Sequence, residues 1–266
     1  MTNKQSIKNK PDTTLFVDTF PSMSISKDKI IAICGKPRSS PCDLNRLLHL
    51  DPILFARTQF VFSWIFPNQK SEYVSIAKII TVLHINTIRN YTMQAAYNTG
   101  SGGAAGQGGG DSILRHGVRS EKEFFSRAFA RGYAARRIAA ECGVETEQLQ
   151  QYYAAGLLYE FAEYVQGEKT QAEAARRWRF CDMLCDIITH KNKYTQYKGG
   201  YKHILFTVIA ADYLASKTAK RAGATADKPD TAVMDFLHLP QAALNALKPQ
   251  VQSELDMQLE FLAEGR

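Results

Sequence analysis

Long apolar runs are missing from this sequence of 266 residues. Its most apolar segment, residues 204–215, is interrupted by Asp212 and is far shorter than the roughly 20 residues that a membrane-spanning helix needs. The lysine-bearing stretch at residues 1–11 is not followed by the apolar core of a secretory signal. Both absences favour a cytoplasmic protein, and we expect no membrane contact.

Cysteines are few and do not form a pattern. The five cysteines are odd in number and scattered, which argues against a disulfide framework. Cys181 and Cys185 are one helical turn apart and near His190, but no second cysteine pair completes a zinc site. We therefore expect these cysteines to pack in the core, and we predict neither a bound metal nor a cofactor.

Two common catalytic motifs are absent as well. The sequence has no G-x-S-x-G nucleophile elbow, and no glycine-rich loop ends in GK[ST]. The glycine-rich tract at residues 98–111 follows no strand pattern, so we predict a flexible linker there. Apolar residues make up 45% of the chain and the formal net charge is +7, a globular composition that permits acidic partners or nucleic acid.

What the sequence does contain is a succession of helix signals. Ser40 and Asp51 precede a proline, Asp230 stands ahead of an apolar run, and Thr170 with Glu173 fits a capping box. Apolar residues recur at helical spacing through most of the chain, and no convincing strand pattern appears. We therefore predict an all-α fold, a compact bundle that includes helices starting near Ser26 and Pro240 and helices over residues 71–83, 170–189 and 201–222.

Several segments resemble the HDOD family, a branch of the HD superfamily found in bacterial signalling proteins. Residues 44–57, with Asp51-Pro52 at the turn, and residues 75–90 are similar to its N-terminal pattern. Residues 125–138 and 154–163 (AAGLLYEFAE) look like the part that carries the family's AGLLHDIGK segment. Residues 204–215 are similar to a helix that ends ADRLA in relatives. The resemblance implies an HD-like bundle, with a flexible tail at residues 1–20, an N-terminal helical subdomain at 21–97, the linker at 98–111 and a degenerate HD-like subdomain at 112–266.

The resemblance also implies where a metal site would lie, and this chain departs from it. HD phosphohydrolases hold divalent metals with histidines and aspartates, and the metals activate water. Here Arg127 stands where the first histidine would fall, and Tyr159 and Glu160 replace the His-Asp doublet. His190 and Asp212 match late ligand positions, but two candidates do not make a dinuclear centre. We therefore expect no catalytic residues, no metal and no enzymatic activity.

The remaining acidic residues of this degenerate pocket fall on apolar helix faces. Glu160 and Asp212 each follow apolar residues at helical spacing. Carboxylates on buried faces are costly unless they are paired. We predict that Arg127 pairs with Glu160 or Asp212 and takes the place of the metal as the positive centre. The alternative is that these charges are solvated.

A second candidate site is a mixed basic and aromatic segment between His190 and His203. Basic residues bind phosphates and aromatic faces stack on bases, so the mixture suits single-stranded nucleic acid or a nucleotide. The alternative is a solvated loop. Additional positive surface is predicted on two helices, from Arg131, Arg136 and Arg137 and from Arg176, Arg177 and Arg179. The residues of the segment are Lys191, Lys193, Tyr194, Tyr197, Lys198, Tyr201 and Lys202.

Three functions follow from these observations. The leading prediction is a non-catalytic bacterial regulatory protein that binds another protein, and the HDOD resemblance implies a link in trans to cyclic-dinucleotide or two-component signalling. The first alternative is a nucleotide- or nucleic-acid-binding module that uses residues 190–203. The second alternative is a residual metal-dependent phosphohydrolase.

Overall fold

The computed structural model describes residues 24–36, 40–69, 72–98, 121–161, 170–218 and 230–264. Every regular element within these ranges is helical, which confirms the predicted all-α fold class. The predicted tail lies outside the described residues, as does the predicted linker apart from Asn98. In chain order the elements are α2 (Ser24–Cys34), α3 (Pro41–Leu50), α4 (Pro52–Ile65), the 3₁₀ helix η1 (Pro67–Gln69), α5 (Ile76–Leu83), α6 (Ile85–Asn98), α7 (Glu121–Glu141), α8 (Leu149–Leu158), α10 (Gln171–Arg177), α11 (Asp182–His190), the 3₁₀ helix η2 (Lys191–Gln196), α12 (Lys202–Thr218), α13 (Thr231–Leu237) and α14 (Gln241–Ala263).

Side-chain caps start four helices where the sequence predicts them. The Ser40 hydroxyl accepts a backbone N–H bond at the start of α3, and the Asp51 carboxylate accepts two at the start of α4. Asp230 caps α13 in the same way, and Thr170 with Glu173 forms the complete capping box of α10. These bonds satisfy N–H groups that the first helical turn leaves without a partner.

Other predicted boundaries are wrong. Ser26 does not cap α2 but lies inside it, buried, where its hydroxyl donates to the Asp51 carboxylate. Helix α5 begins at Ile76 and not at residue 71, because the Ser75 hydroxyl accepts the N–H of Lys78 and fixes the first turn there. Ser26 therefore does not mark the helix start, because tertiary packing gives its hydroxyl a buried acceptor at the start of another helix.

The predicted helix over residues 170–189 is two helices, α10 and α11. Helix α10 ends at Arg177, and Arg179 adopts a φ of 51°, which lies outside the range of a right-handed α-helix. The break turns Trp178 and Phe180 inward, where both pack edge-on against Phe161 with ring centroids 4.6 and 5.6 Å away. Burial of this aromatic group outweighs the helical propensity of the segment.

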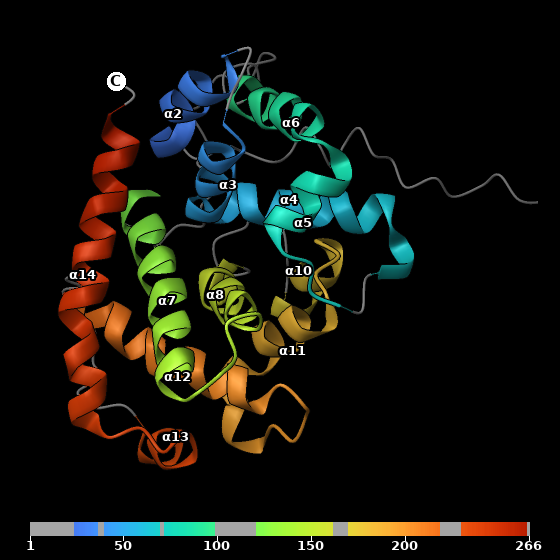
Figure 1. The fold of residues 1–266 in the computed structure, drawn as a ribbon. Coiled ribbons are helices and arrows are strands. Elements are labelled where there is room, and N and C mark those ends of the chain that lie inside the picture. Colours follow the sequence, from blue (N-terminus) through green and yellow to red (C-terminus); the bar gives the residue numbers. More distant parts are fainter. Residues whose placement is uncertain are drawn as a thin grey trace, which may run out of the picture.

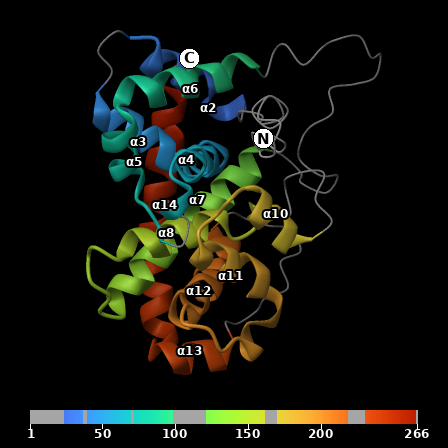
Figure 2. The same ribbon diagram turned by 90° about the vertical axis from the view of Figure 1, so that its right-hand side faces the viewer.

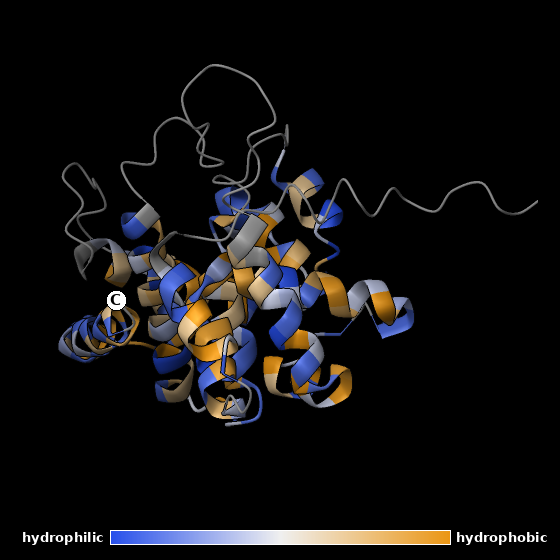
Figure 3. Cartoon of the chain, turned by 90° about the horizontal axis from the view of Figure 1, so that it is seen from above, coloured by the Kyte–Doolittle hydropathy of each residue, from blue (hydrophilic) through white to orange (hydrophobic). Residues whose placement is uncertain are grey.

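Helix α7 is the central element of the second half of the chain. It packs most extensively against α8, α12 and α14, and α11, α12 and α13 lie at the end of the molecule opposite α2–α6 (Figures 1 and 2). Helices α2–α6 form the other end of the molecule, and α4 is buried along most of its length there. Individual helices carry both apolar and polar residues, as Figure 3 shows, and the apolar ones form a core that is shared by both ends.

Helix α14 runs along both ends of the molecule (Figure 2). Near its C-terminus the Phe261 ring lies under two cations, with Lys29 Nζ 4.1 Å and the Arg46 guanidinium carbon 3.8 Å from the ring centroid. Arg46 Nε also donates to Gln258 Oε1 at 2.8 Å. We call this group the Phe261 contact; it joins α14 to α2 and α3. Among the described helices, none is long and apolar enough to cross a membrane.

Candidate functional site

Helices α7 and α8 cross at a contact between two glycines. A Cβ placed on Gly156 would lie 2.8 Å from the carbonyl oxygen of Arg131 and 2.9 Å from Cα of Gly132, closer than real Cβ atoms approach backbone. The two helix backbones therefore touch at this crossing, which only residues without a side chain permit. The crossing places Arg131 of α7 beside the C-terminal end of α8, which Glu160 follows.

Four charged side chains meet next to this crossing. Arg127 Nη2 lies 2.7 Å from Glu160 Oε1, and Arg131 Nη2 lies 2.6 Å from Glu160 Oε2. Asp212, from α12, completes the group: its Oδ1 is 2.8 Å from Arg131 Nε and 3.4 Å from Arg127 Nη2. The ion pair predicted between Arg127 and a carboxylate is therefore present. We call Arg127, Arg131, Glu160 and Asp212 the ion-pair cluster.

The ion-pair cluster is withdrawn from water. The Arg131 side chain is 0% exposed, those of Arg127 and Glu160 are about a tenth exposed at 11% and 10%, and only Asp212 keeps 29%. Its two positive and two negative charges balance. Ion pairs in such a setting are retained only when geometry and hydrogen bonding offset the loss of hydration. Both carboxylates have contacts of 2.8 Å or less with the arginines, whereas Arg127 Nε and Arg131 Nη1 are buried without a hydrogen-bond partner among the described residues.

Arg131 belongs to this cluster against the sequence prediction of positive surface, because its side chain is fully buried. Burial alone would lower its pKa, but Glu160 and Asp212 outweigh that effect and raise it. Burial likewise acts to raise the pKa of Asp212, and the charges and hydrogen bonds of Arg131 and Arg127 overcome it and hold that pKa below its usual value. Arg131 and Asp212 therefore each favour the charged form of the other at neutral pH.

The depressed pKa of Asp212 predicts how stability changes with acid. A carboxyl whose pKa is lower in the folded state contributes stability above its unfolded pKa of about 3.9, and this contribution is lost as pH falls through the folded value. The difference in unfolding free energy between wild type and Asp212→Asn should therefore be constant near neutrality and shrink below about pH 4. Urea unfolding of both proteins at several pH values measures it. A difference that does not change with pH would show that Asp212 has an ordinary pKa.

Tyr159 and Lys191 lie on one side of the ion-pair cluster. The Tyr159 ring contacts two cations, with the Arg131 guanidinium carbon and Lys191 Nζ each 5.0 Å from its centroid. Lys191 Nζ also donates to the carbonyl oxygen of Tyr159 at 3.1 Å. Lys191 is only 4% exposed, so its predicted place in an exposed basic segment is wrong: the lysine supports the end of α8 instead.

His190 is not joined to the ion-pair cluster. Its Nδ1 lies 2.9 Å from the backbone oxygen of Asp186, one turn earlier in α11, and its ring is 4.9 Å from that of Tyr197. Among the described residues, no hydrogen bond or ion pair connects it with Glu160 or Asp212. The predicted pocket residues Arg127, Tyr159, Glu160 and Asp212 thus come together, whereas His190 serves the end of its own helix.

The tyrosines of the 190–203 segment are engaged within the protein. Tyr194 donates its hydroxyl to Asp230, and Tyr197 is buried and donates to Asp186 Oδ2 at 2.6 Å. Burial and the hydrogen bond to that carboxylate raise the pKa of Tyr197 to about 12. Tyr197 is therefore unsuited to stacking on a base, against the sequence prediction. Of the seven predicted contact residues, Tyr194, Tyr201 and Lys202 are half-buried and Lys193 and Lys198 are exposed.

Lys202 is also occupied, because its ammonium lies over two aromatic rings. Nζ is 5.1 Å from the ring centroid of Phe206 and 4.9 Å from that of Phe236. Phe206 in turn packs edge-on against Tyr194 at 5.8 Å. The basic and aromatic residues of the segment thus build a folded corner between α11, α12 and α13, and the mixture that resembled a nucleic-acid surface is largely internal packing.

The donor atoms at this centre do not fit the divalent metal that an HD-type site implies. Both oxygens of Glu160 and Oδ1 of Asp212 already face guanidinium groups at 2.8 Å or less. A divalent cation there would have to displace one or both arginines or lie beside them, and like charges at such distances repel strongly. Across the described parts of the chain, no group of three or more histidine, cysteine, aspartate or glutamate side chains is placed to hold a metal. Cys181 and Cys185 are free thiols, Cys181 being buried.

No family model matches this sequence, and no curated protein matches it. Solved structures do. The MmoQ response regulator from Methylococcus capsulatus strain Bath superimposes with a TM-score of 0.63 at 12% identity, over 87% of this chain and 98% of that one. The chain has the fold of MmoQ.

A second structure of MmoQ, of its fragment 20–298, gives a TM-score of 0.58 at 15% identity over 85% of this chain and 94% of that one. An HDOD domain protein of unknown function from Geobacter sulfurreducens also matches, with a TM-score of 0.36 at 18% identity over 94% of this chain and 93% of that one. At these identities, the MmoQ likeness extends to the fold alone.

Proposed function

We propose that this chain is a bacterial regulatory protein of the HDOD type, that its HD-like centre is structural, and that it acts by binding another protein. The observation that carries this proposal is the ion-pair cluster. Where a metal-dependent relative would use histidines and aspartates, two arginines neutralise Glu160 and Asp212. The centre then joins α7, α8 and α12 and offers no metal-activated water for hydrolysis.

The comparison with MmoQ supports the regulatory part of the proposal. MmoQ is described as a response regulator, and the similar fold extends over nearly the whole of that chain. This chain would work with its signalling partner in trans, and that partner would belong to a two-component or cyclic-dinucleotide system. The five free thiols suit a reducing compartment such as the cytoplasm.

Metal analysis of the full chain tests the non-catalytic part. After incubation with Mn²⁺, Zn²⁺ or Fe²⁺ and mild dialysis, we expect much less than one equivalent of metal per chain, because Arg127 and Arg131 occupy the carboxylates. We also expect no Mn²⁺-dependent hydrolysis of bis(p-nitrophenyl) phosphate. Near-stoichiometric metal, or hydrolysis that Asp212→Asn abolishes, would overturn the proposal and favour a phosphohydrolase.

The protein-binding part requires a purified partner. A candidate captured from the source organism supports the proposal only if the two purified proteins co-elute in gel filtration. A salt-sensitive mobility shift with a short single-stranded oligonucleotide, lost on substitution of Lys193 and Lys198, would favour nucleic-acid binding instead.

A further inference from the structure

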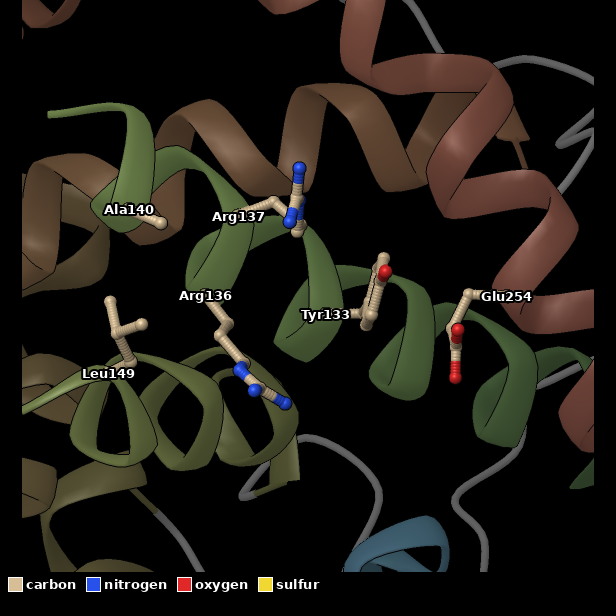
Figure 4. Close-up of a pocket in the computed structure, with 6 residues that line it drawn as sticks. All are labelled: Tyr133, Arg136, Arg137, Ala140, Leu149 and Glu254. Atoms are coloured by element: carbon tan, nitrogen blue, oxygen red, sulfur yellow. The ribbon is translucent and has the colours of Figure 1, made fainter. Parts of the chain in front are cut away.

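A hollow lies on the outer face of α7, away from the ion-pair cluster. Its volume is about 290 Å³, slightly below the roughly 300 to 1,000 Å³ of typical ligand pockets. Four of its residues come from α7, one from the start of α8 and one from α14 (Figure 4). The lining residues are Tyr133, Arg136, Arg137, Ala140, Leu149 and Glu254.

Two arginines dominate the charge of this hollow. Figure 4 shows that Arg136 and Arg137 extend in different directions from neighbouring positions of α7, with Tyr133 between them and Glu254. Arg136 is exposed and forms no hydrogen bond or ion pair with another described residue. Arg137 has only a 4.0 Å approach to Glu141 on its own helix, and its side chain is 38% exposed. Both guanidinium groups therefore retain donors for an acceptor that enters the hollow.

The one acidic residue of the lining does not neutralise these arginines. Glu254 Oε1 accepts a hydrogen bond from Gln258 Nε2 at 2.7 Å, one turn along α14. No ion pair joins Glu254 to either arginine within the described residues. With two positive charges and one negative, the lining carries a net positive charge. Such a site favours an anion, and arginine is well suited to carboxylate and phosphate groups.

The rest of the lining suits the carbon part of a small molecule. Leu149 and Ala140 are apolar, and the Tyr133 ring is held in place by stacking on Phe129 with centroids 6.3 Å apart and an interplanar angle of 20°. We propose that this hollow binds a small organic or inorganic anion with at least two carboxylate or phosphate groups, one facing each arginine. This proposal shares no residue with the ion-pair cluster and stands independently of the proposed function.

Calorimetric titration of the full chain with citrate and with pyrophosphate tests this proposal, and acetate is the singly charged comparison. At constant ionic strength, we expect at least one of the two multivalent anions to bind in the millimolar range or tighter and acetate to bind at least about tenfold more weakly. Which anion binds more tightly shows whether the natural ligand carries carboxylate or phosphate groups.

Matched variants assign the binding to the hollow. Arg136→Gln/Arg137→Gln should weaken binding at least about tenfold, the effect of losing a charge-assisted hydrogen bond. Ala140→Phe should weaken it by filling the hollow without changing charge, and Glu254→Gln should strengthen it several-fold by removing a repulsive carboxylate. Arg176→Gln removes one charge from an exposed site on α10 and should leave the affinity unchanged.

Three results would overturn the proposal. The first is that neither citrate nor pyrophosphate binds to wild type at about 10 mM, a concentration well above a dissociation constant of 1 mM. The second is that the double arginine variant binds the anion with the same affinity as wild type. The third is that Arg176→Gln weakens binding as much as the double arginine variant does. Ala140 and Arg136 are exposed and Arg137 is half-buried, so thermal unfolding of each variant is measured in parallel, and affinities are compared only between variants that unfold cooperatively.

Discussion

Replacement of Arg131 by methionine is expected to lower the free energy of unfolding by about 3 to 5 kcal/mol, the cost of breaking a buried ion pair by removing one partner. Arg131 is fully buried and contacts Glu160 at 2.6 Å and Asp212 at 2.8 Å. Methionine fills a similar volume, so the loss comes from leaving both carboxylates short of positive charge. Urea unfolding at pH 7 measures the effect.

The control for this variant is Arg136→Met, on the same helix but exposed, which should change stability by no more than about 0.5 kcal/mol. The double variant Arg131→Met/Glu160→Gln should be less destabilised than the sum of its single variants, because the second substitution removes a buried negative charge that the first leaves with Arg127 as its remaining cation. Strict additivity would mean that the two residues do not interact.

Replacement of Gly156 by alanine should be the second large effect. Alanine is favoured over glycine in an exposed helix by about 1 kcal/mol, so helical propensity alone predicts a gain in stability. The added Cβ would lie 2.8 Å from the carbonyl oxygen of Arg131, which is backbone and cannot rotate away. Forcing α7 and α8 apart should instead destabilise the protein by about 1 to 3 kcal/mol, the usual cost of overpacking.

The matched control is Gly200→Ala, since a Cβ at Gly200 would have no atom within 4 Å. We expect its stability to stay within about 0.5 kcal/mol of wild type in thermal or urea unfolding. If Gly156→Ala were as stable as this control, the close approach of α7 and α8 would be wrong. The position of Arg131 beside Glu160, which depends on that approach, would then be in doubt as well.

The ion-pair cluster was half predictable from the sequence. The helical spacing of Glu160 and Asp212 relative to apolar neighbours indicates buried carboxylates, and Arg127 is the cation that the HDOD resemblance places near them. The same spacing argument places Arg131 on the buried side of its helix, since it follows Arg127 by one helical turn. It also precedes Gly132, which lies at the crossing with α8. A charged residue next to a glycine that faces another helix is a signal of burial that composition alone does not give.

The 190–203 segment shows why the remaining part could not be predicted. Lysines and tyrosines have the same sequence pattern whether their polar ends reach solvent or reach acceptors inside the protein. The acceptors here, Asp186, Asp230 and the carbonyl oxygen of Tyr159, come from three different places in the chain. Likewise, the break between α10 and α11 depends on Phe161, an aromatic partner from another element. Both outcomes depend on tertiary contacts that helical periodicity does not encode.

The Phe261 contact joins parts of the chain that are synthesised at very different times. Arg46 and Gln258, which hydrogen-bond within it, are 212 positions apart in sequence. Pairings of such separation form late because a long chain must first be brought together. On the ribosome, α2 and α3 emerge long before α14, whose residues complete the Phe261 contact. During synthesis they therefore expose surface that the finished protein hides, and this is the stage at which a chaperone has most to protect.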